Sequence, residues 1–342
     1  MEYMDIKQVA TGLISIPPNG WGAIERIIWE YKKNLELLGN NVEIVNIDGV
    51  SKDAINHVHV ANLALHCRDN NIPYVFSLHD HHVEWYGKGS WVYNQNLEAI
   101  KGSIISFTHA EHLINLFDET DKLFYLSHGV DTEFFTPNLS TKDHKLMMLA
   151  NNGVAGDSTY DRKGFRYGVE AAKALDLPIT IVGTDNLLAF FDAHKDLLEY
   201  EKLTLIANNP NDETVRSLYH EHTIFLHPSM LEAGHPNLTL LEAASSCLPV
   251  VGTYKGSKII RGMYVLPEIS TENVINGITY TINNYDFLLE TMNEKRSSYD
   301  WMNVCKILDR FYKNVAKVKE TYTSEKTKQL YINTYNNTPR YV

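Results

Sequence analysis

The chain has 342 residues, which is long enough for two domains of ordinary size, each with its own hydrophobic core. Its 44% hydrophobic and 21% charged residues are typical of a soluble globular protein and exclude a disordered one. The net charge of −11 argues against a generally basic surface for nucleic acids, although it leaves room for a local basic groove.

The cysteines and the apolar segments bear on the compartment. Cys67, Cys247 and Cys305 show no paired spacing, which favours a reducing environment. The sequence begins without the basic and apolar segments of a signal peptide, and no apolar run approaches the ~20 residues of a membrane helix. We therefore expect a cytoplasmic protein.

Strands and helices alternate in the first part of the chain. We expect an amphipathic helix over residues 23–38, and strands over residues 9–16, 41–47, 56–60, 73–78 and 104–108. Gly20 and Gly22 lie in a tight turn between the first strand and this helix. They do not form a dinucleotide-binding motif, because its third glycine position holds Glu25.

A metal site is an alternative at the end of the strand over residues 73–78. His79, Asp80, His81 and His82 follow this strand, with Glu84 nearby, and all are residue types that bind metals. Adjacent side chains of an extended segment point in opposite directions, however, so these groups would not converge on one ion. We do not expect a metal site here.

The second part of the chain follows a polar linker over residues 138–144. We expect strands over residues 145–150, 178–182 and 203–207, and helices from Gly164 to about residue 175 and over 212–220. The segment from Leu288 to Tyr322 has a helical pattern throughout.

Residues 223–253 contain the most informative motif. An apolar strand ends at His227-Pro228-Ser229, a loop with glycine follows, and a helix from Leu238 leads to Pro249 and another strand. Such a loop lies at the carboxyl end of a parallel strand, where α/β sheets bind ligands, and the first helical turn favours an anion. Glu232 and Glu242 flank this anion site, where carboxylates are costly unless they bind neutral hydroxyls. A ligand with phosphate at the helix N-terminus and hydroxyl groups at the carboxylates matches a sugar nucleotide.

Three segments resemble the retaining glycosyltransferases of the family-four type, which have the GT-B fold. The first spans Ser229 to Val251, with Ser229-x-x-Glu232, Asn237-Leu-Thr-Leu-Leu-Glu242 and Leu248-Pro-Val-Val. The others are the turn PPNGWGAIER, which contains Gly20 and Gly22, and the stretch from Leu126 to Pro137. The resemblance covers roughly residues 14–312.

The resemblance assigns roles by motif position. The residues that it implies for catalysis are His79, Glu232 and Lys163. Those that it implies for binding the donor are Gly20, Gly22, Arg162, Lys163, Gly234, His235, Asn237, Leu238, Thr239 and Glu242.

The sequence departs from the family's motif at two places. Nine residues separate Glu232 from Glu242, two more than usual, so either Glu232 keeps its role or Gly234 occupies the place of the first acid. We favour the first interpretation. In addition, Asn152-Gly153 stands where an arginine usually binds the diphosphate, and Arg162 is the candidate replacement.

The alternation of strands and helices predicts an α/β fold, and the resemblance implies GT-B, with two Rossmann-like domains facing each other across a cleft. We expect an acceptor domain over residues 1–137, joined by a terminal helix at about 319–342, and a donor domain over 145–318. The chain has no Asp-x-Asp motif, so we expect no metal and no cofactor besides a UDP- or GDP-type sugar nucleotide.

The acceptor stays open. A glycan, a lipid-linked saccharide or a small molecule is the default for the family, and a phage-type enzyme acting on hydroxymethylcytosine in DNA is an alternative. A non-hydrolysing sugar-nucleotide epimerase and a non-catalytic sugar-nucleotide-binding protein also remain possible.

Overall fold

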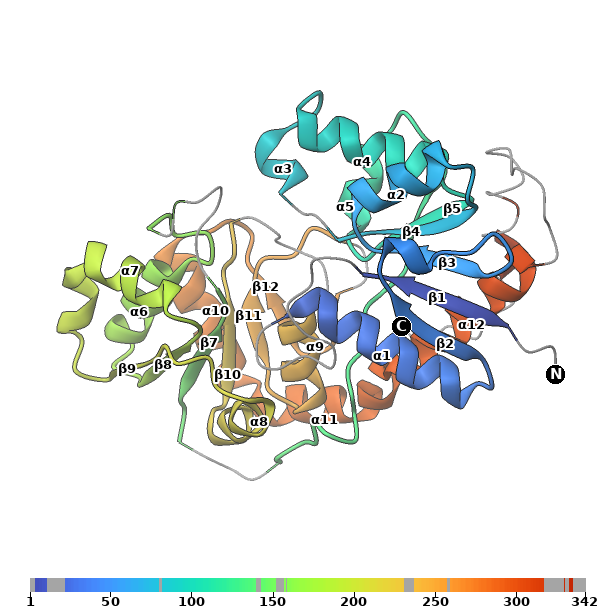
Figure 1. Ribbon diagram of the computed structural model, residues 1–342. Helices are drawn as coiled ribbons and strands as arrows, with labels where there is room; N and C mark the ends of the chain where they lie inside the picture. The colour runs from blue at the N-terminus through green and yellow to red at the C-terminus, as the bar shows by residue number, and fades with distance from the viewer. Residues whose placement is uncertain are drawn as a thin grey trace. The chain divides into compact units, whose positions relative to one another are not determined.

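The computed structural model describes residues 4–10, 22–79, 82–139, 143–151, 157, 159–230, 237–256, 259–316, 329 and 332–334. The chain forms two compact units: unit 1 comprises Met1–Gly129 and Asp300–Val342, and unit 2 comprises Val130–Tyr299. Each unit contains a six-stranded parallel sheet with helices on both faces (Figure 1). The predicted α/β class with parallel sheets is confirmed.

The sheet of unit 1 has the strand order β2-β1-β3-β4-β5-β6. Its strands are β1 (Asp5–Val9), β2 (Asn41–Val45), β3 (Ile55–Val58), β4 (Tyr74–Leu78), β5 (Ile105–Thr108) and β6 (Leu123–Tyr125). The helices of unit 1 are α1 (Ala23–Leu37), η1 (Ile47–Gly49), α2 (Ala61–Asp69), α3 (Val83–Tyr86), α4 (Trp91–Gly102), α5 (Glu111–Leu116) and α12 (Trp301–Ala316).

Two layers of helices enclose this sheet. Helices α2, α4 and α5 pack on one face, where Tyr93 stacks on Phe117 with 4.7 Å between the ring centroids. Helices α1 and α12 pack together on the other face (Figure 1). Asn40 donates a hydrogen bond to Asp309 at 2.9 Å there, so residues far apart in the sequence share one core.

The first strand begins earlier than the sequence predicts. We expected it over residues 9–16, whereas β1 is Asp5–Val9 and residues 11–21 lie outside the described part. The polar residues Lys7 and Gln8 interrupt the apolar pattern and hid the strand. Lys7 pairs with Glu43 at 2.7 Å, and Oε1 of the buried Gln8 accepts a hydrogen bond from His59, which follows β3.

The sheet of unit 2 has the order β12-β11-β10-β7-β8-β9. Its strands are β7 (Leu146–Leu149), β8 (Ile179–Val182), β9 (Leu203–Ile206), β10 (Ile224–His227), β11 (Val250–Gly252) and β12 (Met263–Val265). The helices of unit 2 are α6 (Phe165–Ala174), α7 (Asn186–Ala193), η2 (Lys195–Glu199), α8 (Asp212–Glu221), α9 (Leu238–Ser245), α10 (Thr271–Asn283), α11 (Tyr285–Lys295) and η3 (Arg296–Tyr299).

The central strands β7, β10 and β11 of unit 2 are buried on both faces, as parallel strands usually are, whereas the edge strands β9 and β12 are only partly buried. Ile224 and Leu226 of β10 face the core beneath α6, α7 and α10. Phe225 points to the opposite face, where Tyr219 of α8 lies 5.8 Å away between ring centroids. Helix α9 packs beside α11 and η3 in unit 2.

The helical pattern over residues 288–322 divides into separate helices. Helix α11 ends at Lys295, and α12 begins at Trp301 after η3. Asp300 starts the new helix, because its carboxylate accepts a hydrogen bond from the Met302 amide at 2.8 Å. Helix α12 belongs to unit 1, whereas residues 319–328, 330–331 and 335–342 of the expected terminal helix lie outside the described residues.

None of the described helices combines the length and the apolar character that crossing a bilayer requires.

Candidate functional site

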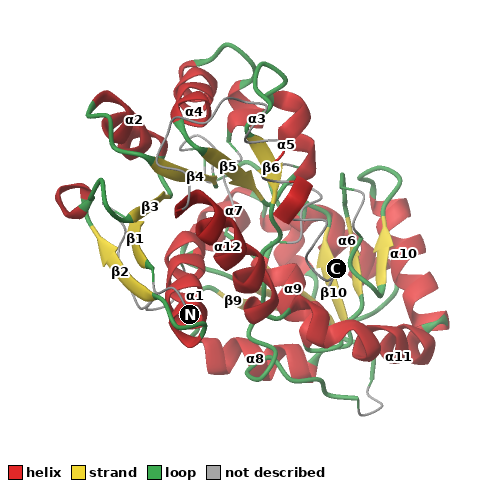
Figure 2. Ribbon diagram, turned by 90° about the vertical axis from the view of Figure 1, so that its right-hand side faces the viewer, coloured by secondary structure: helices red, strands yellow, loops and turns green. Residues whose placement is uncertain are grey.

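The sheet of unit 2 changes its direction of winding between β7 and β10 (Figure 1). The chain passes outward from β7 to β8 and β9 on one side, and from β10 to β11 and β12 on the other. Figure 2 shows the strands of the protein in yellow between red helices. Open α/β sheets bind ligands at the carboxyl ends of the strands that flank such a point. The segments that follow β7 and β10 contain the donor-binding residues that the sequence predicts for unit 2.

Arg162 and Lys163 bring two cationic side chains to this edge of the sheet. They are 8% and 7% exposed, and Nη2 of Arg162 donates to the carbonyl of Asn151, just after β7, at 2.9 Å. The Arg162 carbonyl accepts from the Met230 amide at 2.9 Å and from the Ser229 hydroxyl at 3.3 Å. The segments after β7 and β10 are therefore joined directly.

Gly164 is required by the close approach of the same two segments. Its φ of +72° lies in the left-handed region, and a Cβ atom would lie 2.3 Å from the carbonyl oxygen of Pro228. No side chain fits this space without moving the backbone after β10.

We expect Gly164→Ala to destabilise the protein by about 2–5 kcal/mol, because it combines backbone strain with overpacking. The matched control is Gly89→Ala, where φ is +85° but nothing lies within 4 Å of the added Cβ. Urea unfolding followed by circular dichroism measures both losses. Equal losses would show that contact with Pro228 contributes nothing.

The first turn of α6 is capped by the side chain of Asp161, which precedes the helix. Oδ1 of Asp161 accepts from the Phe165 amide at 2.8 Å, and Oδ2 accepts from the Arg166 amide at 3.0 Å. Burial raises the pKa of Asp161, while the same amide hydrogen bonds act in the opposite direction. The amides of Phe165 and Arg166 thus already donate hydrogen bonds to a carboxylate. The start of α9 is therefore the better candidate for binding an anion.

The start of α9 is organised by Asn237. Its Oδ1 accepts hydrogen bonds from the Leu240 amide at 3.0 Å and from the Thr239 hydroxyl at 2.9 Å. Its Nδ2 donates to Nε2 of the buried His227, 3.2 Å away. Leu238 is the first residue of the helix. These contacts fix the N-terminal turn of α9 against the end of β10.

Glu242 lies one turn into α9 and is 8% exposed. Its Oε2 is 3.1 Å from the hydroxyl of Tyr219, which also lies 3.2 Å from the carbonyl of Thr239. The hydroxyl therefore links α8 to α9 and orients the carboxylate of Glu242. A carboxylate oriented in this way is suited to accept hydrogen bonds from the hydroxyls of a ribose.

His79 belongs to a chain of hydrogen bonds at the carboxyl edge of unit 1. Its Nε2 lies 2.9 Å from Nδ1 of His59, and Nε2 of His59 lies 2.7 Å from Oε1 of Gln8. Burial lowers the pKa of His59 well below its usual value, helped by the neighbouring His57 and His79. His59 is therefore neutral and acts as a fixed hydrogen-bond partner for His79.

Gly22 directly precedes α1, where its carbonyl accepts from the Arg26 amide at 3.0 Å. A Cβ atom on Gly22 would meet the Glu25 carboxylate at 2.7 Å, a contact that the flexible Glu25 side chain could relieve by moving. The remaining predicted site residues lie outside the described residues; they are Gly20, Glu232, Gly234 and His235.

Sequence analysis did not identify two partners of the predicted residues. His227 receives the hydrogen bond of Asn237, and Tyr219 orients Glu242. The position of His227 at the end of an apolar strand was a usable signal. Tyr219 had none, because its contact depends on how α8 packs against α9.

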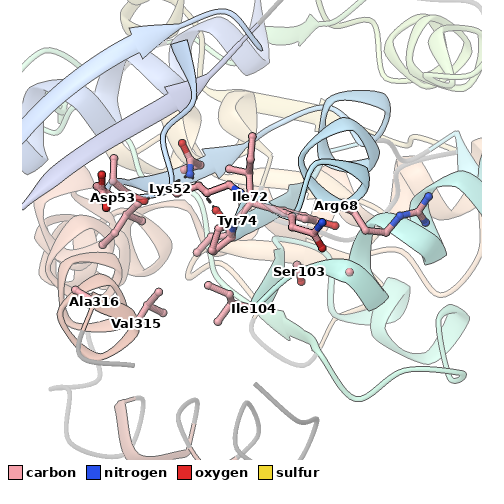
Figure 3. Close-up of a pocket in the computed structure, with 16 residues that line it drawn as sticks. Lys52, Asp53, Arg68, Ile72, Tyr74, Ser103, Ile104, Val315 and Ala316 are labelled. Carbon is pink, nitrogen blue, oxygen red and sulfur yellow. Dashed lines mark hydrogen bonds between the residues drawn. The ribbon is translucent and has the colours of Figure 1, made fainter. Parts of the chain in front are cut away.

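Unit 1 also has a cavity of about 600 Å³ at the amino ends of β3, β4 and β5 (Figure 3). Asn56 and Tyr74 lie in its wall, and their polar atoms are used by the fold. The Asn56 amide donates to the carbonyls of Ser51 and Pro73 at 2.7 and 3.0 Å, and the Tyr74 hydroxyl donates to Ala99 at 2.7 Å. Ligands of such sheets bind at the opposite edge, so this cavity is not the candidate site.

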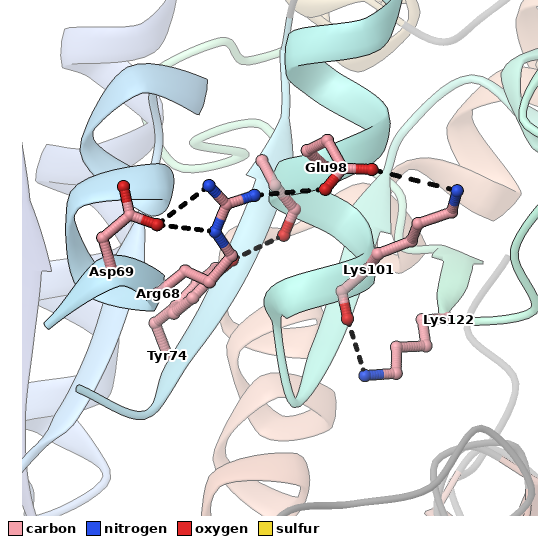
Figure 4. A network of polar contacts seen from close by, with 7 residues as sticks. Arg68, Asp69, Tyr74, Glu98, Lys101 and Lys122 are labelled. Carbon is pink, nitrogen blue, oxygen red and sulfur yellow. Dashed lines mark hydrogen bonds and ion pairs between the residues drawn. The ribbon is translucent and has the colours of Figure 1, made fainter. Parts of the chain in front are cut away.

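An ion-pair network borders this cavity (Figure 4). Arg68 lies 2.8 Å from Asp69 and 3.2 Å from Glu98, which in turn lies 3.9 Å from Lys101. Lys122 donates to the carbonyl of Lys101 at 2.9 Å, near the end of α4. The ion pairs are solvent-exposed and contribute about 0–1 kcal/mol each, so we interpret the network as structural.

Comparisons with known proteins find structural similarity only. A scan against protein-family models finds no match, and no curated protein matches the chain. Sucrose-phosphate synthase from Thermosynechococcus elongatus is 11% identical with a TM-score of 0.72, covering 91% of this chain and 99% of the other. Anabaena HepE, solved with UDP and glucose, is 12% identical with a TM-score of 0.67, covering 92% and 100%.

A glycosyltransferase from Rickettsia africae is 15% identical with a TM-score of 0.61, covering 98% of this chain and 100% of the other. Identities this low establish the fold and leave the activity to be argued from the site. The similarity extends over nearly the whole length of each chain, so it includes both Rossmann-like units. The chain has the GT-B fold of these glycosyltransferases.

Proposed function

We propose that this protein is a glycosyltransferase that moves a sugar from a nucleoside-diphosphate sugar to an acceptor hydroxyl, with retention of configuration and without a metal ion. The observation that carries the proposal is that Arg162 is hydrogen-bonded to the segments after β7 and β10, while Asn237 at the start of α9 is hydrogen-bonded to His227 at the end of β10. The cationic side chains of Arg162 and Lys163 are both buried, and Glu242 lies one turn further along α9.

Each group has a role in binding the donor. Arg162, Lys163 and the amides of Leu238 and Thr239 would bind the diphosphate, because cationic groups and a helix N-terminus favour anions. Glu242 would accept hydrogen bonds from the ribose. The structures of HepE with UDP and glucose and of an E. coli protein with UDP-2-fluoro glucose support a UDP-type donor. A GDP-type donor is the alternative that the sequence leaves open.

The remaining predicted residues complete the site in this proposal. Glu232 and His79 would contact the donor sugar, and Gly20, Gly22, Gly234 and His235 would let the backbone approach the donor. We assign the donor to unit 2 and the acceptor to unit 1. A glycan, a lipid-linked saccharide or a small molecule would be the acceptor.

In this proposal the protein's own cations take the place of a metal in the departure of the diphosphate. Negative charge develops on the leaving diphosphate as the bond to the sugar breaks. Arg162, Lys163 and the α9 amides would stabilise it, and the burial of the two cationic side chains would strengthen that effect. Retention follows from the resemblance to the family-four enzymes.

We therefore expect transfer to continue at its full rate after exhaustive dialysis against EDTA. The measurement is the rate of nucleoside-diphosphate release with and without the chelator. Magnesium and manganese ions are added back to the treated protein as the control. Loss of turnover that either ion restores would contradict metal-independent transfer.

A further inference from the structure

Three histidines of unit 1 come together at the carboxyl edge of its sheet. His79 directly follows β4, His109 directly follows β5, and His128 lies shortly after β6. One ligand nitrogen from each lies within 4.8 Å of those of the other two. The ring centroids of His109 and His128 are 3.6 Å apart, and His79 lies 5.9 and 6.3 Å from them.

Strand register explains this convergence. Leu78 of β4 pairs with Thr108 of β5, so His79 and His109 occupy equivalent positions immediately after neighbouring strands. The Leu126 amide donates to the carbonyl of Thr108 at 2.9 Å and continues the ladder toward His128. Residues distant in the sequence are thus placed side by side by the backbone of the sheet.

The turn that carries His128 is fixed against α12. A Cβ atom on Gly129 would lie 2.7 Å from the Cα atom of Trp301, so the turn touches the helix backbone. The Trp301 ring lies 6.2 Å from the His128 ring. His109 and His128 are 5% and 6% exposed, whereas His79 is only partly buried. The cluster is therefore fixed against α12 through the turn of His128, and solvent reaches it past His79, the least buried of the three histidines.

Hydrogen bonds also determine which ring nitrogen of His79 carries the proton. Nε2 of His59 donates to Oε1 of Gln8 at 2.7 Å, which leaves the lone pair of His59 on Nδ1. This Nδ1 accepts a hydrogen bond from Nε2 of His79 at 2.9 Å, so the lone pair of His79 is on Nδ1. Metal-binding histidines usually donate their second ring N–H to a fixed acceptor in this manner.

We propose that His79, His109 and His128 bind a divalent transition-metal ion, for which Zn²⁺ is the best fit. Three neutral imidazoles with a fourth position for water or an anion form a common zinc site. Imidazole ligands also disfavour Mg²⁺ and Ca²⁺, which prefer oxygen. Zinc–nitrogen bonds of ~2.0–2.1 Å place the nitrogens of tetrahedral ligands about 3.3 Å apart. The histidine nitrogens lie within 4.8 Å of one another, so each needs to move by only about an ångström to bind the ion.

Metal binding would remove His79 from the donor sugar. This consequence rests on the proposed function, in which His79 contacts that sugar, whereas metal binding itself does not. The three histidines belong to unit 1, whereas the groups proposed to bind the diphosphate, Arg162, Lys163 and the α9 amides, belong to unit 2. Zn²⁺ would therefore act as an inhibitor and not as a cofactor.

The test is titration of the full-length, tag-free and metal-free protein with Zn²⁺ in a calorimeter. We expect one tightly bound ion per chain, and a 10- to 100-fold weaker affinity in His109→Gln and in His128→Gln. The matched control is His66→Gln on the exposed surface of α2, which should bind Zn²⁺ as the original protein does. Circular dichroism checks that each variant is folded.

A second measurement needs no variant. Co²⁺ added to the original protein should give visible absorption bands of a nitrogen-ligated ion, and Zn²⁺ should displace it. Absence of tight binding, or equal weakening by His66→Gln and His109→Gln, would overturn the proposal. Zinc binding without any glycosyl transfer would leave the metal site standing and refute the proposed function, and transfer without zinc binding would do the reverse.

Discussion

Lys163→Ala is expected to lower the turnover number for glycosyl transfer by about 100- to 1000-fold, the range found when one preorganised charge-stabilising donor is removed. Lys163 is 7% exposed and directly precedes Gly164, whose backbone contacts Pro228 at the winding change of the sheet. Its charge thus acts in a medium that screens it weakly. Because the diphosphate gains charge as it leaves, the loss should appear mainly in kcat.

The control removes a lysine from α6, the helix that begins two residues after Lys163. Lys173 is exposed in the last turn of α6, and Lys173→Ala should leave kcat and KM unchanged. Lys163→Met keeps most of the apolar stem and separates the charge from packing. If both Lys163 variants retained normal kinetics while melting at a lower temperature, Lys163 would be a structural residue.

Glu242→Gln should weaken the affinity for the sugar nucleotide about 10- to 150-fold, which corresponds to ~1.5–3 kcal/mol for a hydrogen bond to a charged group. The substitution keeps the shape of the side chain and removes its charge. Glu242 is 8% exposed, so its bond to a ribose hydroxyl would be shielded from water. Isothermal titration with the donor measures the change directly.

Tyr219→Phe serves as the matched comparison for Glu242. It removes the hydroxyl that lies 3.1 Å from Oε2 of Glu242 and leaves the carboxylate in place. We expect a loss of only about 0.5–1.5 kcal/mol in donor affinity, since the hydroxyl orients the acid without touching the donor. Unchanged donor affinity in Glu242→Gln, together with a lower melting temperature, would assign the carboxylate to the α8–α9 contact alone.

Local sequence patterns predict an element correctly where the residues of that element alone determine its structure. The strand β10 and helix α9 were predicted from an apolar run, a turn and one apolar helix face, and the structure confirms both. The strand β1 was displaced in the prediction because Gln8, which is fully buried, reads as a surface residue until its bond to His59 is known. Partners that lie 51 positions apart leave no local pattern.

In the candidate site, too, the sequence predicts some residues but not the contacts that depend on the fold. Arg162 could be proposed from its place in the sequence, but its contact with Asn151 depends on how the segment after β7 folds back. His109 and His128 were not identified as site residues, because their meeting depends on the order of β4, β5 and β6 in the sheet. The apolar runs predict that strands exist, whereas strand order is a property of the whole unit.

The most direct test of the central claim is incubation of the protein with UDP- and GDP-sugars and a panel of acceptors. The panel contains glycans, lipid-linked saccharides, small alcohols and DNA with hydroxymethylcytosine. We predict that free nucleoside diphosphate and a glycosylated product form in equal amounts, and that NMR shows the anomeric configuration of the donor in the product. Conversion of one sugar nucleotide into another without an acceptor, or binding of the donor with no reaction at all, would contradict the account.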